Sequence, residues 1–104
     1  MKYALLYNER AKENLRGILR YISKDNPKRA LTYVEEIETA INNLAYFPFM
    51  GTPLKRKNNR MLLYGNYKIT YEIKENKNQV YIKRVKHCAQ DDRENTPVHL
   101  EESP

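Results

Sequence analysis

The chain has 104 residues, 40% of them hydrophobic, a formal net charge of +6 and one cysteine. This length fits a single domain with a modest core, and a lone cysteine excludes an internal disulfide, in keeping with a reducing cytoplasm. No apolar run is long enough to cross a bilayer and no signal peptide opens the chain, so we expect a soluble, cytoplasmic protein without a membrane partner.

The first half of the chain predicts a strand followed by a helical hairpin. Residues 2–7 are rich in aromatic residues and predict a strand, and Asn8 suits the N-cap of a helix over about residues 9–24. Pro27 suits the first position of a second helix, because its missing amide costs nothing there. A connection this short requires antiparallel helices. Both helices repeat apolar residues every three or four positions: Ala11, Leu15, Ile18, Ile22, and then Ala30, Val34, Ile37, Ile41, Leu44.

An irregular connection follows the second helix. Residues 47–53 contain two prolines and a glycine, which disfavour regular structure. We expect Phe47 and Phe49 to pack at the rim of the core, the usual place for phenylalanine in a connecting loop. Residues 55–60 then predict a basic, polar loop.

Residues 60–90 predict a three-stranded antiparallel meander. The first strand is residues 61–64, and the second shows strict alternation of apolar and polar residues from Tyr67 to Ile73. A polar turn at residues 75–78 leads to the third strand, in which Arg84 interrupts the apolar alternation and indicates either a bulge or a stem lying across the sheet. The predicted fold class is α+β, with a helical hairpin on the inner face of one four-stranded, mostly antiparallel sheet.

The basic charge is concentrated in this second half. Residues 47–90 carry ten basic and two acidic residues, whereas residues 1–46 carry eight and six. Such a field attracts polyanions. The predicted target-binding residues, expected on one outward surface, are Lys55, Arg56, Lys57, Arg60, Lys83, Arg84 and Lys86. Residues 1–90 thus form the predicted domain, and residues 91–104 an acidic, mobile tail without periodicity.

The ordered set of motifs resembles the RelE/ParE superfamily of bacterial toxins over roughly residues 2–90. The residues that carry the resemblance are residues 21–27 with Ala30, residues 44–48 with Gly51, Arg60, residues 65–67 with Ile69, residues 71–73, residues 82–87 and Gln90. The hairpin and the ending from His87 to Gln90 look more like the ParE branch than the RelE branch.

The resemblance implies the toxin of a type II toxin–antitoxin pair, of the kind used in plasmid stabilization and neutralised by a cognate acidic antitoxin. A ParE-like toxin is expected to inhibit DNA gyrase by binding, with no cofactor. The alternative is a RelE-like enzyme that cuts mRNA on the ribosome, and a third interpretation is an inert basic binding module. If a sheet edge is open, we expect an acidic antitoxin segment to add along it as a strand.

Metal-independent RNA cleavage needs a base, a cation and an acid. Arg60, Lys68 and Arg84 are the candidate cations, and His87 or Tyr71 are the candidates for proton transfer, since an imidazole can titrate near neutral pH. Two departures from the RelE pattern count against this activity. RelE has an arginine where this chain has Lys68, and its basic cluster after the last strand is replaced here by residues 87–90.

Each candidate residue also has a purely structural interpretation. Tyr67 and Tyr71 are in phase with the apolar positions of their strand, which favours a place in the core. Arg60 can anchor the preceding loop through carbonyl groups, and His87 can cap a strand end. Cys88 with two histidines does not make a zinc site, so no metal is expected.

Overall fold

The structure, a computed structural model, describes residues 2–89. Its regular elements are β1 (Ala4–Tyr7), α1 (Glu9–Ser23), α2 (Pro27–Asn42), β2 (Thr52–Pro53), β3 (Asn59–Tyr64), β4 (Tyr67–Lys74) and β5 (Gln79–His87). Short 3-10 turns lie at η1 (Asn43–Ala45), η2 (Pro48–Met50) and η3 (Glu75–Lys77). In this part of the chain neither helix has the length and apolarity to cross a membrane. The predicted tail lies outside the described residues.

The strands form one mixed sheet in the order β1-β5-β4-β3-β2. β1 runs parallel to β5, and the other neighbours are antiparallel. The predicted α+β fold class is confirmed, but the sheet has five strands and not four. β2 was missed because it has only two residues, too few to show alternation, and one of them is Pro53, which has no amide to donate.

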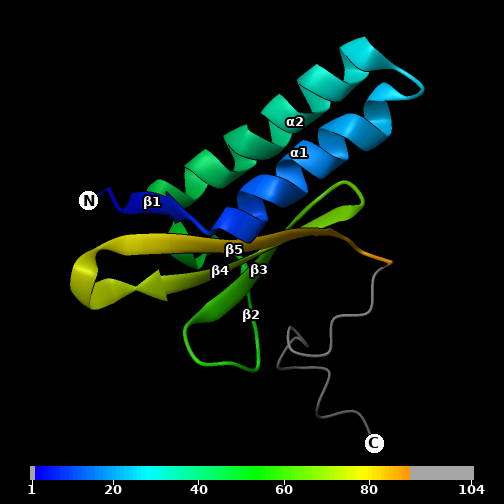
Figure 1. Cartoon of the computed structure of the whole chain (residues 1–104). Helices are drawn as coiled ribbons and strands as arrows, with labels where there is room; N and C mark the ends of the chain where they lie inside the picture. Colours follow the sequence, from blue (N-terminus) through cyan, green and yellow to red (C-terminus); the bar gives the residue numbers. More distant parts are fainter. Residues whose placement is uncertain (1, 90–104) are drawn as a thin grey trace, which may run out of the picture.

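The helical hairpin begins at two asparagine caps. The Asn8 side chain accepts a hydrogen bond from the Arg10 amide at 2.9 Å, and the Asn26 side chain accepts one from the Arg29 amide at 3.1 Å. Pro27 occupies the first turn of α2, as predicted. Figure 1 shows the two helices side by side on the same side of the sheet.

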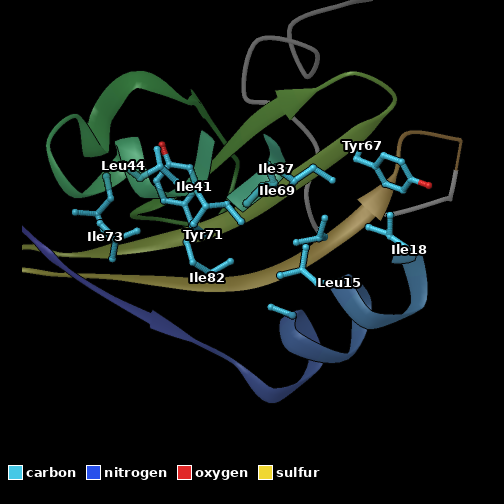
Figure 2. Packing of buried hydrophobic residues seen from close by; sticks show 13 residues of the cluster. Leu15, Ile18, Ile37, Ile41, Leu44, Tyr67, Ile69, Tyr71, Ile73 and Ile82 are labelled. Atoms are coloured by element: carbon cyan, nitrogen blue, oxygen red, sulfur yellow. The ribbon is translucent and has the colours of Figure 1, made fainter. Parts of the chain in front are cut away.

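The core lies between the hairpin and the helix-facing side of the sheet, which we call the inner face. Ile37, Ile41 and Leu44 come from the second helix and the turn after it, and they pack with Ile69 and other inner-face residues in one cluster (Figure 2). All four are fully buried. Burying a side chain of this size contributes about 1.5–3 kcal/mol, so the hairpin and the sheet stabilise each other.

The turn after α2 differs from the prediction. Phe47 and Phe49 are 65% and 51% exposed, whereas Pro48 between them is buried. The expected packing of the two phenylalanines on the core is therefore wrong. The reason is that Pro48, in the η2 turn, is the residue that is buried. A buried tyrosine hydroxyl forms hydrogen bonds with the backbone of the same segment.

That hydroxyl belongs to Tyr71, which is fully buried. It donates to the Pro48 carbonyl at 2.7 Å and accepts from the Gly51 amide at 3.0 Å. Burial raises the pKa of Tyr71, although the Gly51 hydrogen bond and the nearby Arg60 charge oppose the shift. At Gly51 an added Cβ would lie 2.5 Å from this hydroxyl and 2.8 Å from the Met61 carbonyl oxygen, so the position accepts no side chain.

A β-bulge in β5 explains the interrupted alternation at Arg84. Thr70 pairs with Arg84, but the next residue of β4, Tyr71, pairs with Ile82. Lys83 is therefore the extra residue, and one of the two predicted explanations is confirmed. The bulge returns Val85 to the core, where it is almost fully buried.

Replacing Tyr71 with phenylalanine should lower the free energy of unfolding by about 2 kcal/mol, because the Pro48 carbonyl and the Gly51 amide lose their buried partner. Urea denaturation of the purified protein measures this change. Tyr81→Phe is the control, because this side chain is only partly buried. Equal stability of the two variants would contradict the anchoring role of Tyr71.

Candidate functional site

The face of the sheet opposite the helices, here called the outer face, carries a concentration of basic side chains. Side chains alternate along a strand and paired residues point the same way, so the register assigns each residue to a face. Ile69 and Tyr71 lie in the core, and Lys68, Thr70 and Glu72 therefore point outward. The register places four basic residues on the outer face, Lys68, Lys74, Arg84 and Lys86, against one acidic residue, Glu72. Lys83 is the unpaired bulge residue, and its ammonium reaches this face through Asn59, which pairs with Glu72.

Several of these cations are held in place. The Lys83 ammonium donates to Asn59 Oδ1 at 3.0 Å, and this asparagine is itself buried. The Arg84 guanidinium donates to the Lys83 carbonyl at 3.0 Å. Thr70 pairs with Arg84 from the middle strand β4 and is 1% exposed, and within residues 2–89 its hydroxyl has no hydrogen-bond partner. The outer face therefore combines fixed positive charge with a buried, unused hydroxyl.

Arg60 lies on the other face. It pairs with Tyr71, and its guanidinium donates to the Phe49 carbonyl at 3.0 Å and the Gly51 carbonyl at 2.7 Å. It also lies over the Phe49 ring, 5.2 Å from the centroid. The structural interpretation of Arg60, an anchor acting through carbonyls, is the one the contacts support.

His87 also lies on the inner side, at the end of β5. It pairs with Tyr67, and the two rings are almost perpendicular, with 5.3 Å between their centroids. Its Nδ1 accepts a hydrogen bond from the Ala89 amide at 3.1 Å, as a residue that caps a strand end would. The side chain lines a cleft under the hairpin, away from the outer face.

The four candidate nuclease residues thus divide into two pairs. Arg60 and His87 are in register with core tyrosines, whereas Lys68 and Arg84 occupy alternate positions and point outward. The expectation that all predicted cations share one outward surface is wrong for Arg60, because the register places it on the inner face. The other proton-transfer candidate, Tyr71, is buried, and its hydroxyl is hydrogen-bonded to the backbone.

The basic loop contributes separately to the charged surface. Lys55, Arg56 and Lys57 are exposed between β2 and β3, at the edge of the sheet farthest from β1. Buried Leu54 and the hydrogen bond from the Leu54 amide to the Asn59 carbonyl at 2.9 Å hold the base of this loop. In the described range of residues, no group of three or more histidines, cysteines or acidic residues is arranged to hold a metal ion.

The cleft that contains His87 was not predicted. Its volume is about 990 Å³, and its walls come from α1, the start of α2, the start of β4 and the end of β5. Tyr33 lies 5.9 Å from Tyr67 between ring centroids, and Arg29 lies 5.0 Å from the centroid of Tyr33. Burial raises the pKa of Tyr67, and the neighbouring hydroxyls of Tyr33 and Tyr21 add to the shift. The abundance of tyrosine in the sequence was the available signal, but the contacts join residues far apart in the chain.

A chain of polar contacts connects the cleft to the C-terminal end of β3. Arg29 forms a two-pronged ion pair with Glu36 at 2.7 and 3.2 Å, and the Tyr64 hydroxyl donates to the same carboxylate. The hydrogen bonds from Arg29 and, second, from Tyr64 lower the pKa of Glu36. This link joins α2 to the strand that leads into the β3–β4 turn.

We expect Arg60→Met to lower the free energy of unfolding by about 1–2 kcal/mol, because the variant keeps the apolar stem and loses two charge-assisted hydrogen bonds that water can partly replace. Lys86→Gln on the outer face is the control and should change stability little. Denaturant titration measures both. An Arg60→Met variant as stable as the control would contradict the anchoring role.

Replacing Glu36 with glutamine should destabilise the protein slightly at neutral pH, since the ion pair with Arg29 is lost. The folded-state pKa of Glu36 is lowered, so its stabilising effect is complete above the ordinary value of 4.5 and disappears as the pH falls through the lowered pKa. Thermal unfolding from pH 7 to pH 3 measures the difference between the two proteins. A difference that grows on acidification would contradict this assignment.

Residues 5–92 match the family model described as the ParE toxin of the type II toxin–antitoxin system, parDE. No curated protein sequence matches the chain significantly. Several solved structures share its fold.

The chromosomal ParDE toxin–antitoxin system of P. aeruginosa has a TM-score of 0.71 and 19% identity, covering 83% of this chain and 96% of that chain. The RelBE2 toxin–antitoxin complex of Mycobacterium tuberculosis has a TM-score of 0.60 and 24% identity, covering 84% and 99%. The isolated E. coli RelE toxin has a TM-score of 0.65 and 15% identity, covering 88% and 89%. At these identities the likeness concerns the fold alone.

Proposed function

Because this chain belongs to the ParE family of toxins of type II toxin–antitoxin systems, we propose that it arrests growth by binding DNA gyrase, without covalent chemistry of its own. Gyrase acts in the cytoplasm, so the proposal places the toxin there. The basic loop and the outer-face cations Lys83, Arg84 and Lys86 are the proposed contacts to the target.

The observation that carries this proposal is the separation of Arg60 and His87 from Lys68 and Arg84. Cleavage of RNA without a metal needs a base, an acid and a cation around one phosphate. The register puts Arg60 and His87 on one face of the sheet and Lys68 and Arg84 on the other. The Arg60 guanidinium also donates to two carbonyl groups. Inhibition by binding does not require these groups to converge.

The proposed partner that neutralises the toxin is a cognate antitoxin with an acidic segment. β1 is an edge strand with β5 on one side only, and an extended peptide can add to such an edge by backbone hydrogen bonds. Carboxylates of the same segment would meet the basic surface of the toxin. Charge-matched docking of this kind is fast and weakens as the salt concentration rises.

The second candidate function is cleavage of mRNA on the ribosome. The pair Lys68 and Arg84 favours it, since the register makes these two cations diagonal neighbours on the outer face, where both can contact one phosphate. In this version Lys68 and Arg84 hold the phosphate on the outer face, and Arg60 and His87 take no part. An inert basic binding module of the same fold is the third candidate.

Induction of the chain in bacteria tests all three candidates. The proposed function predicts DNA double-strand breaks with SOS induction and intact mRNA, because gyrase inhibition leaves cut DNA ends. Pulsed-field electrophoresis and mapping of mRNA 5′ ends measure the two outcomes in the same culture. Cut messages without DNA breaks would replace the proposal with the ribonuclease, and neither lesion would favour the inert module.

The variants His87→Ala and Lys68→Gln are matched controls for this experiment. Gyrase inhibition should survive both with little change, because neither residue is among the proposed contacts. Loss of DNA breakage in the His87→Ala variant at unchanged stability would contradict the assignment.

A further inference from the structure

The segment from Tyr46 to Met50, here called the aromatic loop, exposes an unusual amount of apolar surface. Tyr46, Phe47, Phe49 and Met50 are each more than half exposed, and they supply half of the large hydrophobic residues that are exposed between residues 2 and 89. Single exposed apolar residues are common in soluble proteins. Four of them within five consecutive residues are typical of a surface that another protein covers.

The backbone of the aromatic loop is nevertheless rigidly held. Tyr71 donates to the Pro48 carbonyl, and Arg60 donates to the carbonyls of Phe49 and Gly51. The amides of Tyr46 and Phe47 both donate to the Asn43 carbonyl, at 3.1 and 3.0 Å. Poor folding therefore does not explain the exposure of the side chains. A surface held in advance loses little conformational entropy when a partner binds, which favours affinity.

The charge around the aromatic loop restricts the partner. The Lys2 ammonium lies 5.7 Å from the ring centroid of Tyr46, and Arg60 lies over Phe49. The sequence has no aspartate or glutamate between Glu38 and Glu72. An apolar patch with cations on two of its rings suits an acidic surface with apolar pockets. It disfavours a second copy of this chain, because each copy carries a net charge of +6.

We propose that the aromatic loop is the anchor by which this toxin holds its protein target, with Phe47 and Met50 inserted into apolar pockets of an acidic surface. This inference rests on the proposed function and adds to it a contact that lies apart from the outer face. Aromatic side chains that become buried in pockets near the centre of an interface often supply much of its binding energy.

The test uses the double variant Phe47→Gln, Met50→Gln in the complete chain, with Leu31→Gln as the matched control. Leu31 is 59% exposed on α2 and lies outside the aromatic loop. We expect the double variant to keep the circular dichroism spectrum and melting temperature of the wild type. It should bind purified gyrase at least about tenfold more weakly and lose growth arrest on induction, whereas Leu31→Gln should retain both properties.

A stable double variant that still arrests growth as the wild type does would overturn this inference and leave the proposed function intact. Wild-type chain that arrests growth but does not bind gyrase would overturn the gyrase proposal, and the arrest assay would still decide the role of the loop. Wild-type chain that is dimeric by light scattering, with a monomeric double variant, would show a self-association surface and overturn the inference. If the double variant unfolds, Lys2→Glu provides the test, and unchanged arrest by that variant would likewise overturn it.

Discussion

The helical hairpin covers only one face of the sheet, and this asymmetry determines where each charged residue can lie. Burial of Ile69, Tyr71 and Ile82 under α1 and α2 requires the alternate residues of β4 and β5 to point outward. A lysine at one of these fully buried positions would have to be desolvated, at a cost of several kcal/mol. The basic surface of this toxin is therefore a consequence of the packing of its core.

Two polar side chains on the inner face, those of Tyr71 and Arg60, stabilise a turn. Tyr71 and Arg60 bind backbone groups between Pro48 and Gly51, so this irregular segment has a defined shape without burying its own large side chains. The same contacts direct the polar atoms of both side chains toward the backbone of this segment. They also explain how the segment can expose Phe47 and Phe49 and remain ordered.

The distribution of charge separates two kinds of recognition on one small protein. The outer face and the basic loop present cations that suit a polyanion or an acidic protein, and their effect weakens with salt. The aromatic loop presents apolar surface, whose contribution does not depend on salt in this way. A protein target can use both surfaces together, which agrees with inhibition by binding more readily than with chemistry on a single phosphate.

The sequence alone determined both helices, the strands other than β2, and the buried side of the helices and of β4. The asparagine caps, Pro27, the apolar stripes and the alternation of β4 are local patterns, and short-range geometry dictates their outcome. The resemblance of the ordered motifs to RelE and ParE toxins also required no coordinates. Contacts between distant residues were decided by the tertiary structure alone: the register that separates Arg60 from Arg84, the link from Arg29 to Tyr64, and the inward turn of Pro48. A register shift of one residue reverses the face of every side chain in a strand, and only the packing of the whole sheet specifies that register.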